Sequence, residues 1–195
     1  MKRVFDIGGA LAGLLFILPF TPFIAIAVFL ESGWPITVKL DRVSAGRIIK
    51  IYKFRSMKKG AEKEKINLDH LNERNDGPLF KLKDDPRVTR VGRFLRRTRL
   101  DEFPQLINVL KNELSLVGPR PHEPEEMLLY PPEYWQIFLF KAGVTGISQV
   151  SASPYLPFKE EIKMDKHYIE KQSLSLDLKI ILKTIWIFFT KPDGI

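Results

Sequence analysis

Residues 7–30 read "IGGALAGLLFILPFTPFIAIAVFL", a run of 24 residues that contains no charged side chain. About 20 apolar residues are enough for a helix to cross a bilayer, so a spanning helix is one interpretation of this run. A secretory signal peptide is a second interpretation, but the run continues past Pro22 to Leu30 and meets "ESGW", where cleavage is not expected. The length and composition therefore predict a membrane-embedded segment.

Two prolines in the middle of the run argue against one straight helix. Pro19 and Pro22 each remove a backbone donor and clash with the preceding turn, so a sharp bend is expected around them. Thr21 lies between the prolines and can donate its hydroxyl to a carbonyl group that the bend leaves free. Gly9 and Gly13 are four residues apart, which allows close packing against another helix.

Basic residues precede and follow the apolar run, and both groups favour the cytoplasmic side of a membrane. Lys2 and Arg3 precede it, and residues 39–65 carry ten Lys and Arg residues against three Asp and Glu residues. Basic flanks prefer the cytoplasm, whereas a spanning helix would place one of these flanks outside. We therefore expect residues 1–33 to form a re-entrant membrane helix-hairpin and residues 34–195 to form a cytosolic, membrane-associated domain.

The remainder of the chain predicts a mainly α fold with one small β-hairpin. Residues 36–40 and 47–54 are rich in β-branched and aromatic residues, and Ser-Ala-Gly at 44–46 lies between them, which is typical of a hairpin. Turn signals then predict a mobile loop with a helical turn at 58–78, and apolar spacing predicts helices at 87–99 and 102–112. A further loop is expected at 115–126.

Two later segments have the composition of helices that lie in a membrane surface. Residues 131–140 are aromatic and follow a proline pair, and residues 176–189 mix apolar side chains with a few charged ones. Trp135 and Trp186 suit the headgroup region of a bilayer. A core helix is the alternative interpretation of either segment.

The composition restricts the possible chemistry. The 195 residues carry a formal net charge of +8, so we expect an anionic partner such as a membrane surface, a phosphorylated ligand or a nucleic acid. There is no cysteine, which excludes disulfides, thiolate metal sites and a cysteine nucleophile. The three histidines are far apart in the sequence and show no metal-ligand spacing.

Residues 99–106, "RLDEFPQL", place two acids after a series of arginines and just before a proline. One interpretation makes Asp101 the N-cap of a helix with Pro104 in its first turn. A catalytic interpretation is also open, because a helix N-terminus and neighbouring arginines would favour the ionised carboxylate that attacks phosphorus. Glu102 could then supply an oxygen ligand to Mg²⁺.

Three further motifs suit the binding of phosphate. Lys53 and Arg55 in "YKFRSM" are two residues apart and so lie on one face of a strand. Arg120 stands between two prolines in "VGPRP", which fixes the backbone around a guanidinium group. The Gly-bounded segment "GVTGISQV" at 143–150 could lie against a ligand. A solvated basic face or a lipid-binding surface is the alternative for the arginines.

Taken in order, these motifs resemble the bacterial sugar transferase family, the monotopic phosphoglycosyl transferases that act on polyprenyl phosphate. The resemblance spans residues 2–190 and rests on "KRVFDI", the apolar run broken at a Thr-Pro, "IYKFRSM", "RRTRLDEFPQLINVLK", "LSLVGPRP" and "GVTGISQV". It implies a re-entrant membrane helix, interfacial helices and a small catalytic domain. It also implies the minimal catalytic unit of the family, on the cytoplasmic face of the bacterial inner membrane and possibly as a homodimer.

The resemblance implies transfer of a sugar 1-phosphate from a UDP-sugar to undecaprenyl phosphate with release of UMP. Asp101 matches the family's nucleophile, which would form a covalent phosphosugar intermediate, and Glu102 matches its partner, which is associated with Mg²⁺. Other positions match motifs that the resemblance assigns to substrate phosphate or nucleotide: Lys53, Arg55, Arg96, Pro119, Arg120 and Pro121.

The chain departs from the family's motifs outside the acid pair. Lys141-Ala142 replaces an Arg-Pro, "SAS" at 151–153 replaces an Asn-Gly-Arg, and Leu40 stands where a Gln is usual. These departures concern nucleotide contacts and sugar choice, not the class of reaction, and no residue here indicates which sugar is used.

Two other classes of protein compete with this interpretation. A membrane-tethered protein that binds single-stranded nucleic acid would explain the basic charge and the "KIYKF" segment, but carboxylates beside the site would repel phosphates. We therefore expect no nucleic-acid partner. A membrane scaffold without chemistry is the second competitor, and release of UMP from a UDP-sugar would exclude both.

Overall fold

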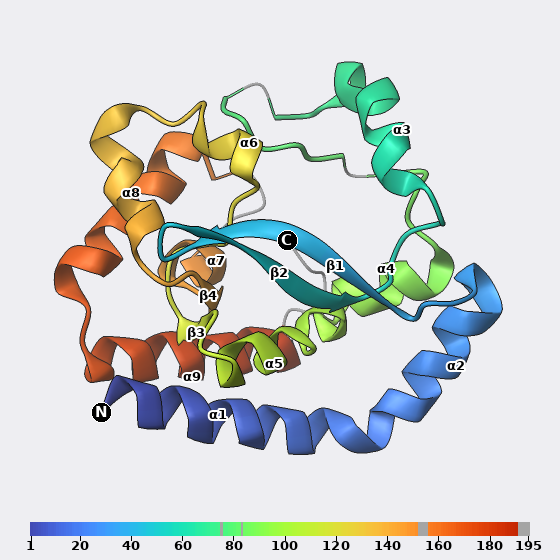
Figure 1. Cartoon of the computed structure of the whole chain (residues 1–195), viewed down its shortest axis with the longest axis horizontal. Helices are drawn as coiled ribbons and strands as arrows, with labels where there is room; N and C mark the ends of the chain where they lie inside the picture. The colour runs from blue at the N-terminus through green and yellow to red at the C-terminus, as the bar shows by residue number, and fades with distance from the viewer. Residues whose placement is uncertain (75, 83, 152–155, 191–195) are drawn as a thin grey trace.

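Figure 1 shows the computed structural model of the chain, which describes residues 1–74, 76–82, 84–151 and 156–190. The fold is mostly helical with one antiparallel hairpin, so the predicted fold class is confirmed. The two longest helices, α1 (Lys2–Ile17) and α9 (Leu174–Thr190), lie side by side along one edge of the molecule. The hairpin crosses the middle of the molecule on the other side of α5 (Gln105–Leu110).

The apolar run forms two helices joined by a bend. A 3₁₀ turn, η1 (Leu18–Phe20), separates α1 from α2 (Thr21–Ser32), and the two prolines occupy the first turns of η1 and α2, where no backbone donor is needed. The Thr21 hydroxyl donates to the carbonyl oxygen of Ile17 at 3.0 Å. The predicted bend and the predicted contact of Thr21 are both confirmed, and Figure 1 shows α2 leading away from α1 toward the start of the hairpin.

The first turn of α1 is attached to the rest of the protein by its basic residues. Lys2 Nζ lies 2.6 Å from Oδ2 of Asp177, a fully buried residue of α9. The Arg3 guanidinium donates to the carbonyl oxygens of Val109 and Leu110, at 2.6 and 2.8 Å, near the end of α5. These contacts therefore hold the start of the apolar segment against the domain that follows the segment in the chain.

The middle of α1 packs closely against the core. The Asp6 carboxylate is buried and accepts a hydrogen bond from the backbone N–H of Leu116 at 2.9 Å. A side chain at Gly9 would overlap Leu116, and one at Gly13 would overlap Leu106 of α5. The predicted close packing at these two glycines is confirmed, with a helix as the partner at Gly13 and a strand as the partner at Gly9.

The hairpin consists of β1 (Thr37–Ser44) and β2 (Arg47–Phe54), which are antiparallel and pair from Thr37 with Phe54 to Ser44 with Arg47. The connecting turn contains only Ala45 and Gly46, with φ angles of 50° and 70°. Two central residues with positive φ are typical of the tight turns that match the twist of a hairpin. The hairpin is confirmed, but its first strand is longer than predicted and includes Ser44.

The arginine-rich helix is shorter than the expected 87–99. It is α4 (Arg90–Arg97), and it begins where the Thr89 hydroxyl accepts a hydrogen bond from the backbone N–H of Gly92 at 2.9 Å. It ends before Arg99, whose φ of 54° lies in the left-handed region. This residue redirects the chain into the turn that carries the acid pair.

The prediction of a continuous loop over 115–126 is wrong at both ends. β3 (Ser115–Val117) pairs in parallel with β4 (Gly143–Thr145), which begins the predicted Gly-bounded turn. All three residues of β3 are buried, and such a short apolar run does not show the alternation of a half-buried strand.

The remaining helical elements are α3 (Ala61–Leu68), η2 (Asp69–Leu71), α6 (Pro124–Met127), η4 (Pro132–Leu139), α7 (Ile147–Ser151) and α8 (Phe158–Lys171).

The helices along the edge of the molecule expose many large apolar side chains. Residues Lys2–Ser32 are long and apolar enough to cross a membrane, with a mean hydropathy of 2.4. The core-helix interpretation of 176–189 holds for one face of α9 only: Ile180 is buried in the core and Leu176 and Ile181 pack against it, whereas the other face is exposed. Side chains of α1, η1, α2 and α9 that are at least half exposed include Leu15, Leu18, Phe20, Phe23, Ile26, Phe29, Leu30, Leu182, Trp186 and Phe189.

A small apolar cluster connects the bent helix to the acid pair. Its buried members come from α1, α2, β2 and α4, and Leu100 and Phe103 pack against it. Because Leu100 and Phe103 flank the acids, the packing of α1 and α2 helps to set where the acids lie. The buried members are Ile17, Ile24, Val28, Phe54 and Leu95.

We predict that Gly92→Ala destabilises the protein, because a Cβ atom at this position of α4 would overlap the backbone carbonyl of Ser56. Backbone cannot move aside as a flexible side chain can, so the cost should be at least about 2–3 kcal/mol. For a chain of this size we expect a fall in Tm of roughly 5–10 °C in detergent. Gly8→Ala is the control, since nothing lies within 4 Å of its Cβ position. Equal Tm values for the two variants would contradict the packing described here.

Candidate active site

The acid pair lies in a short 3₁₀ turn, η3 (Leu100–Glu102), between α4 and α5. The expected helix over 102–112 begins only at Gln105, and Pro104 occupies its N-cap position. The N-cap interpretation of Asp101 is therefore wrong. Among the described residues no side chain forms a hydrogen bond with the Asp101 carboxylate, and its hydrogen bond in the turn comes from its own backbone N–H.

Two elements, β2 and α4, bring positive charges to the acid pair. Lys53 of β2 forms an ion pair with Glu102, with Nζ 2.6 Å from Oε1. Arg96 of α4 is exposed and held by a hydrogen bond from its Nε to the hydroxyl of Ser56 at 2.9 Å. The structure thus brings Lys53, Arg96, Asp101 and Glu102 close together.

Burial raises the pKa of Asp101 to about 6. The positive charge of Lys53 opposes this rise, the adjacent Glu102 adds to it, and Arg96 opposes it. The expectation that the surroundings hold this pKa low is wrong, because loss of hydration outweighs the nearby cations. One unit above a pKa of about 6, at pH 7, roughly nine-tenths of the carboxyl groups are still ionised.

The neighbouring Glu102 shifts in the opposite direction. Burial alone would raise its pKa, but the ion pair with Lys53 and the charges of Arg120 and Arg99 hold that pKa below its ordinary value. Glu102 is therefore a carboxylate at neutral pH. Two adjacent acids with pKa values displaced in opposite directions can serve different roles in one reaction.

The Pro-Arg-Pro motif lies beside the acid pair. The carbonyl of Pro119 accepts a hydrogen bond from the N–H of Gly143 at 2.8 Å, and the N–H of Arg120 donates to Asp165 Oδ2 at 3.0 Å. These contacts fix the backbone while the Arg120 side chain stays exposed, and its charge acts on Glu102. Pro119 is buried and Pro121 is half-buried, so both prolines support the loop.

The spacing of Lys53 and Arg55 suggested that both side chains lie on one face of a strand and bind phosphate. The structure places Arg55 elsewhere. It follows the last residue of β2, and its guanidinium donates to the carbonyl oxygen of Ser32 at 3.2 Å. A cation at the C-terminus of α2 interacts favourably with the helix dipole. The contact connects the end of the apolar segment to the hairpin, and the sequence gives no signal of it.

Some arginines of the series make contacts that stabilise the fold, and others lie close to the acid pair. Arg87 is buried and paired with Asp85, with Nη2 2.6 Å from Oδ2, and its guanidinium lies 5.2 Å from the centre of the Phe80 ring. Arg96 and Arg99 act on the acid pair through their charges. The arginines therefore do not form one continuous phosphate-binding ladder.

Sequence reasoning missed the residue that places α4. The Glu31 carboxylate, near the end of α2, accepts hydrogen bonds from the backbone N–H groups of Arg90 and Val91, both at 2.8 Å. An acid at this position satisfies donors that a helix N-terminus leaves free. No local pattern announces the contact, because the partners are 59 and 60 residues apart.

The acid pair offers two adjacent carboxylates to a metal ion. In the described ranges no group of three or more His, Cys, Asp or Glu side chains is arranged to hold a metal. Mg²⁺ commonly binds through one or two carboxylates together with substrate phosphate, and an ionised Glu102 next to Asp101 fits that requirement. The donor set therefore suits Mg²⁺ that arrives with a phosphorylated substrate.

Comparison of the sequence with known proteins identifies a family and several relatives. The family model described as "Bacterial sugar transferase" matches residues 1–191. The galactosyl transferase CpsE of Streptococcus agalactiae is 41% identical over 94% of this chain. The UDP-galactose-lipid carrier transferase of Erwinia amylovora is 39% identical, and the undecaprenyl-phosphate galactose phosphotransferase of Salmonella typhimurium is 37% identical, each over 100% of this chain.

The match covers this chain almost completely but covers only 41% of each of these three relatives. The matched part includes the acid pair, the basic strand and the Pro-Arg-Pro loop, which the fold brings together. The chain belongs to the bacterial sugar transferase family.

Proposed function

We propose that the chain transfers a sugar 1-phosphate from a UDP-sugar to undecaprenyl phosphate and releases UMP. The observation that carries this proposal is the Asp101 carboxylate, which is buried, largely ionised at pH 7 and free of a side-chain hydrogen bond in the described structure. Relatives named for UDP-galactose, undecaprenyl phosphate and sugar phosphotransfer support the same class of reaction. The product would begin the synthesis of a glycoconjugate or polysaccharide.

The reaction would take two displacements at phosphorus. An Asp101 oxygen attacks the β-phosphorus of the UDP-sugar, the bond from that phosphorus to the bridging oxygen breaks, and UMP leaves. A phosphate oxygen of undecaprenyl phosphate then attacks the same phosphorus and frees the Asp101 carboxylate. No water or redox partner is consumed, and the diphosphate linkage ends on the lipid.

The other residues of the site would neutralise phosphate charge. Lys53, Arg96 and Arg120 surround the acids, and an exposed guanidinium can contact two phosphate oxygens. Glu102 would hold Mg²⁺, with Asp101 as its neighbour in the donor set. Bound Mg²⁺ supplies Lewis-acid stabilisation of the diphosphate charge.

The bent helix would place this site at a membrane surface. The exposed apolar side chains of α1, α2 and α9 suit contact with lipid, and UDP-sugars are cytosolic, so we place the domain on the cytoplasmic face of the bacterial inner membrane. The 2.6 Å contact between Lys2 and Asp177 supports re-entry. A spanning helix would separate the start of α1 from the domain by a core of about 30 Å. A homodimer stays a prediction from the sequence.

Replacement of the nucleophile should stop the reaction without unfolding the protein. For Asp101→Asn we expect at least a ~1,000-fold loss of UMP release, together with loss of any phosphosugar adduct detectable by mass spectrometry. Because burial disfavours the Asp101 charge, the neutral amide should leave the Tm at pH 7.5 unchanged or higher. Activity within about tenfold of wild type, a barrier change of only ~1.4 kcal/mol, would contradict the nucleophilic role.

The pH profile gives a second readout of the same residue. The rate of UMP release should fall about tenfold per unit as pH drops below the Asp101 pKa of about 6, because the protonated acid cannot attack. Lys53 lowers this pKa, so Lys53→Gln should move the midpoint of the profile to higher pH. An unchanged midpoint in Lys53→Gln would show that another group controls the profile.

Removal of Mg²⁺ should abolish turnover. Excess chelator should reduce UMP release by at least about 100-fold, and added Mg²⁺ should restore it, since the diphosphate charge must be neutralised as UMP leaves. Glu102→Gln should raise the Mg²⁺ concentration for half-maximal activity at least about tenfold or eliminate activity. Glu62→Gln, at an exposed acid on α3, is the control. Full activity in excess chelator would exclude this role for Mg²⁺.

The topology can be tested with a single cysteine, because the chain contains none. A cysteine inserted before Lys2 should resist an impermeant thiol reagent in intact cells and react after permeabilisation, since both ends of the bent helix are expected in the cytoplasm. Replacing Pro19 and Pro22 by Leu should shift some molecules to a spanning form that reacts from outside. Outside labelling of the protein with both prolines present would refute re-entry.

A further inference from the structure

Phenylalanine side chains from three elements meet beside the acid pair. Phe16 comes from the last turn of α1, Phe188 comes from α9, and Phe103 directly follows Glu102 at the end of η3. The ring centre of Phe103 lies 5.9 Å from that of Phe16 and 6.2 Å from that of Phe188, and the rings of Phe16 and Phe188 are 6.3 Å apart. All three pairs are within the range of aromatic contacts, so the rings converge on one place, which we call the phenylalanine cluster.

The phenylalanine cluster is open to the surroundings of the protein. Phe16 is 45% exposed, and Phe103 and Phe188 are half-buried. Two further rings extend the cluster: Phe20 lies 5.8 Å from Phe16 and is 50% exposed, and Phe189 lies 5.2 Å from Phe188 and is 70% exposed. A group of neighbouring apolar side chains that the folded chain leaves exposed is typical of a surface that contacts a lipid, a ligand or another protein.

Phe103 connects the cluster to the acid pair. It packs against both buried apolar clusters of the protein, so the fold fixes the position of its ring. The same ring contacts Phe16 and Phe188. The exposed aromatic surface therefore begins directly after Glu102 and continues to α1 and α9, which lie side by side (Figure 1).

The elements around the acid pair differ in the chemistry that they offer to a lipid phosphate. Lys53 of β2 and Arg96 of α4 bring positive charge, whereas α1 and α9 bring aromatic rings. In the proposed reaction the phosphate of the lipid acceptor attacks the phosphorus held by Asp101, so it lies among the cations. The carbon chain bonded to that phosphate carries no charge, and it should leave the site along apolar side chains. The cluster is continuous with the exposed apolar surface of α1 and α9, which we propose contacts lipid.

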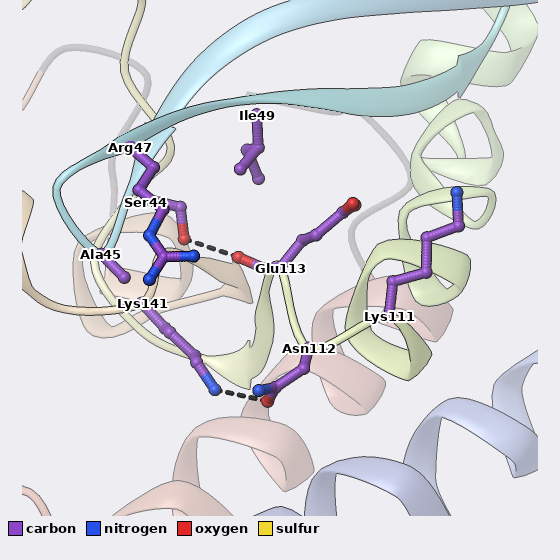
Figure 2. Close-up of a pocket in the computed structure, with 8 residues that line it drawn as sticks. All are labelled: Ser44, Ala45, Arg47, Ile49, Lys111, Asn112, Glu113 and Lys141. Atoms are coloured by element: carbon purple, nitrogen blue, oxygen red, sulfur yellow. Dashed lines mark hydrogen bonds between the residues drawn. The ribbon is translucent and has the colours of Figure 1, made fainter.

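The small pocket at the turn end of the hairpin offers a different environment (Figure 2). It has a volume of about 260 Å³, and none of the described residues that line it is aromatic. Figure 2 shows polar contacts across its lining: the Lys141 amine donates to the side-chain oxygen of Asn112, and the Ser44 hydroxyl donates to the carbonyl oxygen of Glu113. An isoprenoid chain therefore suits the phenylalanine cluster better than this pocket.

We propose that the phenylalanine cluster binds the isoprenoid chain of the lipid acceptor, next to its phosphate group. This inference rests on the proposed function, which supplies the acceptor, and it adds the side chains that hold the apolar part of that substrate. Aromatic side chains bury a large apolar area, and their faces can contact the methyl branches and double bonds of an isoprenoid. Binding here would hold the first isoprene units against α1 and α9 while the phosphate reaches the acid pair.

Photolabelling tests this binding without any turnover. The full chain in phosphatidylcholine nanodiscs is irradiated with a polyprenyl phosphate that carries a diazirine in its first isoprene unit, and labelled residues are identified by mass spectrometry. We expect label on the phenylalanine cluster, reduced at least about threefold by excess undecaprenyl phosphate but not by excess phosphatidylglycerol. Label spread evenly over the exposed apolar side chains of α1, α2 and α9, or equal competition by phosphatidylglycerol, would overturn the proposal in favour of general contact with lipid.

Variant kinetics separate the acceptor from the donor. Phe16→Leu and Phe188→Leu each remove a ring but keep an apolar side chain, and Phe103 is left unchanged because its packing helps to place the acids. In the double variant kcat/KM for undecaprenyl phosphate should fall at least about fivefold, whereas kcat/KM for the UDP-sugar should stay within about twofold. An equal fall for both substrates, or no fall for either, would overturn the proposal.

Phe23→Leu is the matched control, because Phe23 is 73% exposed on α2 and lies outside the cluster. It should leave the photolabelling and both kcat/KM values unchanged, and a fall in kcat/KM for undecaprenyl phosphate equal to that of the double variant would overturn the proposal. Photolabelling uses the unmodified protein, so its result stands even where a variant does not fold. Absence of UMP release from the unmodified protein would contradict the proposed function, whereas normal UMP release with unselective photolabelling would contradict the acceptor site alone.

Discussion

The buried carboxylate of Asp177 determines where the apolar N-terminal segment can lie. A charge that is fully buried needs a partner of opposite sign, and Lys2 at the start of α1 supplies it at 2.6 Å. The Tyr168 hydroxyl donates to the other oxygen of Asp177 at the same distance. Because loss of Lys2 would leave Asp177 with its charge uncompensated by an ion pair, this contact holds the beginning of α1 against the domain.

The far end of the same segment is held by a second set of polar contacts, and these reach the candidate active site. Glu31 caps α4, the helix that carries Arg96, and Arg55 binds the carbonyl of Ser32. The bend at Thr21 lets one continuous apolar segment make both sets of contacts. The segment that we propose contacts lipid is therefore also the segment that positions α4, so the acid pair would keep a fixed position relative to a membrane surface.

Sequence patterns reveal those parts of the fold that depend on neighbouring residues. The prolines and Thr21 predict the bend, and β-branched residues predict the hairpin, because both are local effects. The acid pair and Lys53 are recognised through a family resemblance. The pairing of β3 with β4, the contact of Arg55 and the cap by Glu31 depend on partners far away in the chain. No local pattern contains that information, and the high pKa of Asp101 arises from burial, which also depends on the tertiary fold.

The turn that carries Asp101 explains why this residue, the proposed nucleophile, is not a helix cap. A cap accepts hydrogen bonds from backbone N–H groups, which stabilises the carboxylate and reduces its tendency to attack phosphorus. The left-handed Arg99 and the following 3₁₀ turn instead place the Asp101 carboxylate before the start of α5. Burial raises its pKa while Lys53 and Arg96 limit the rise, so the group remains ionised near neutral pH and yet retains the basicity that a nucleophile requires.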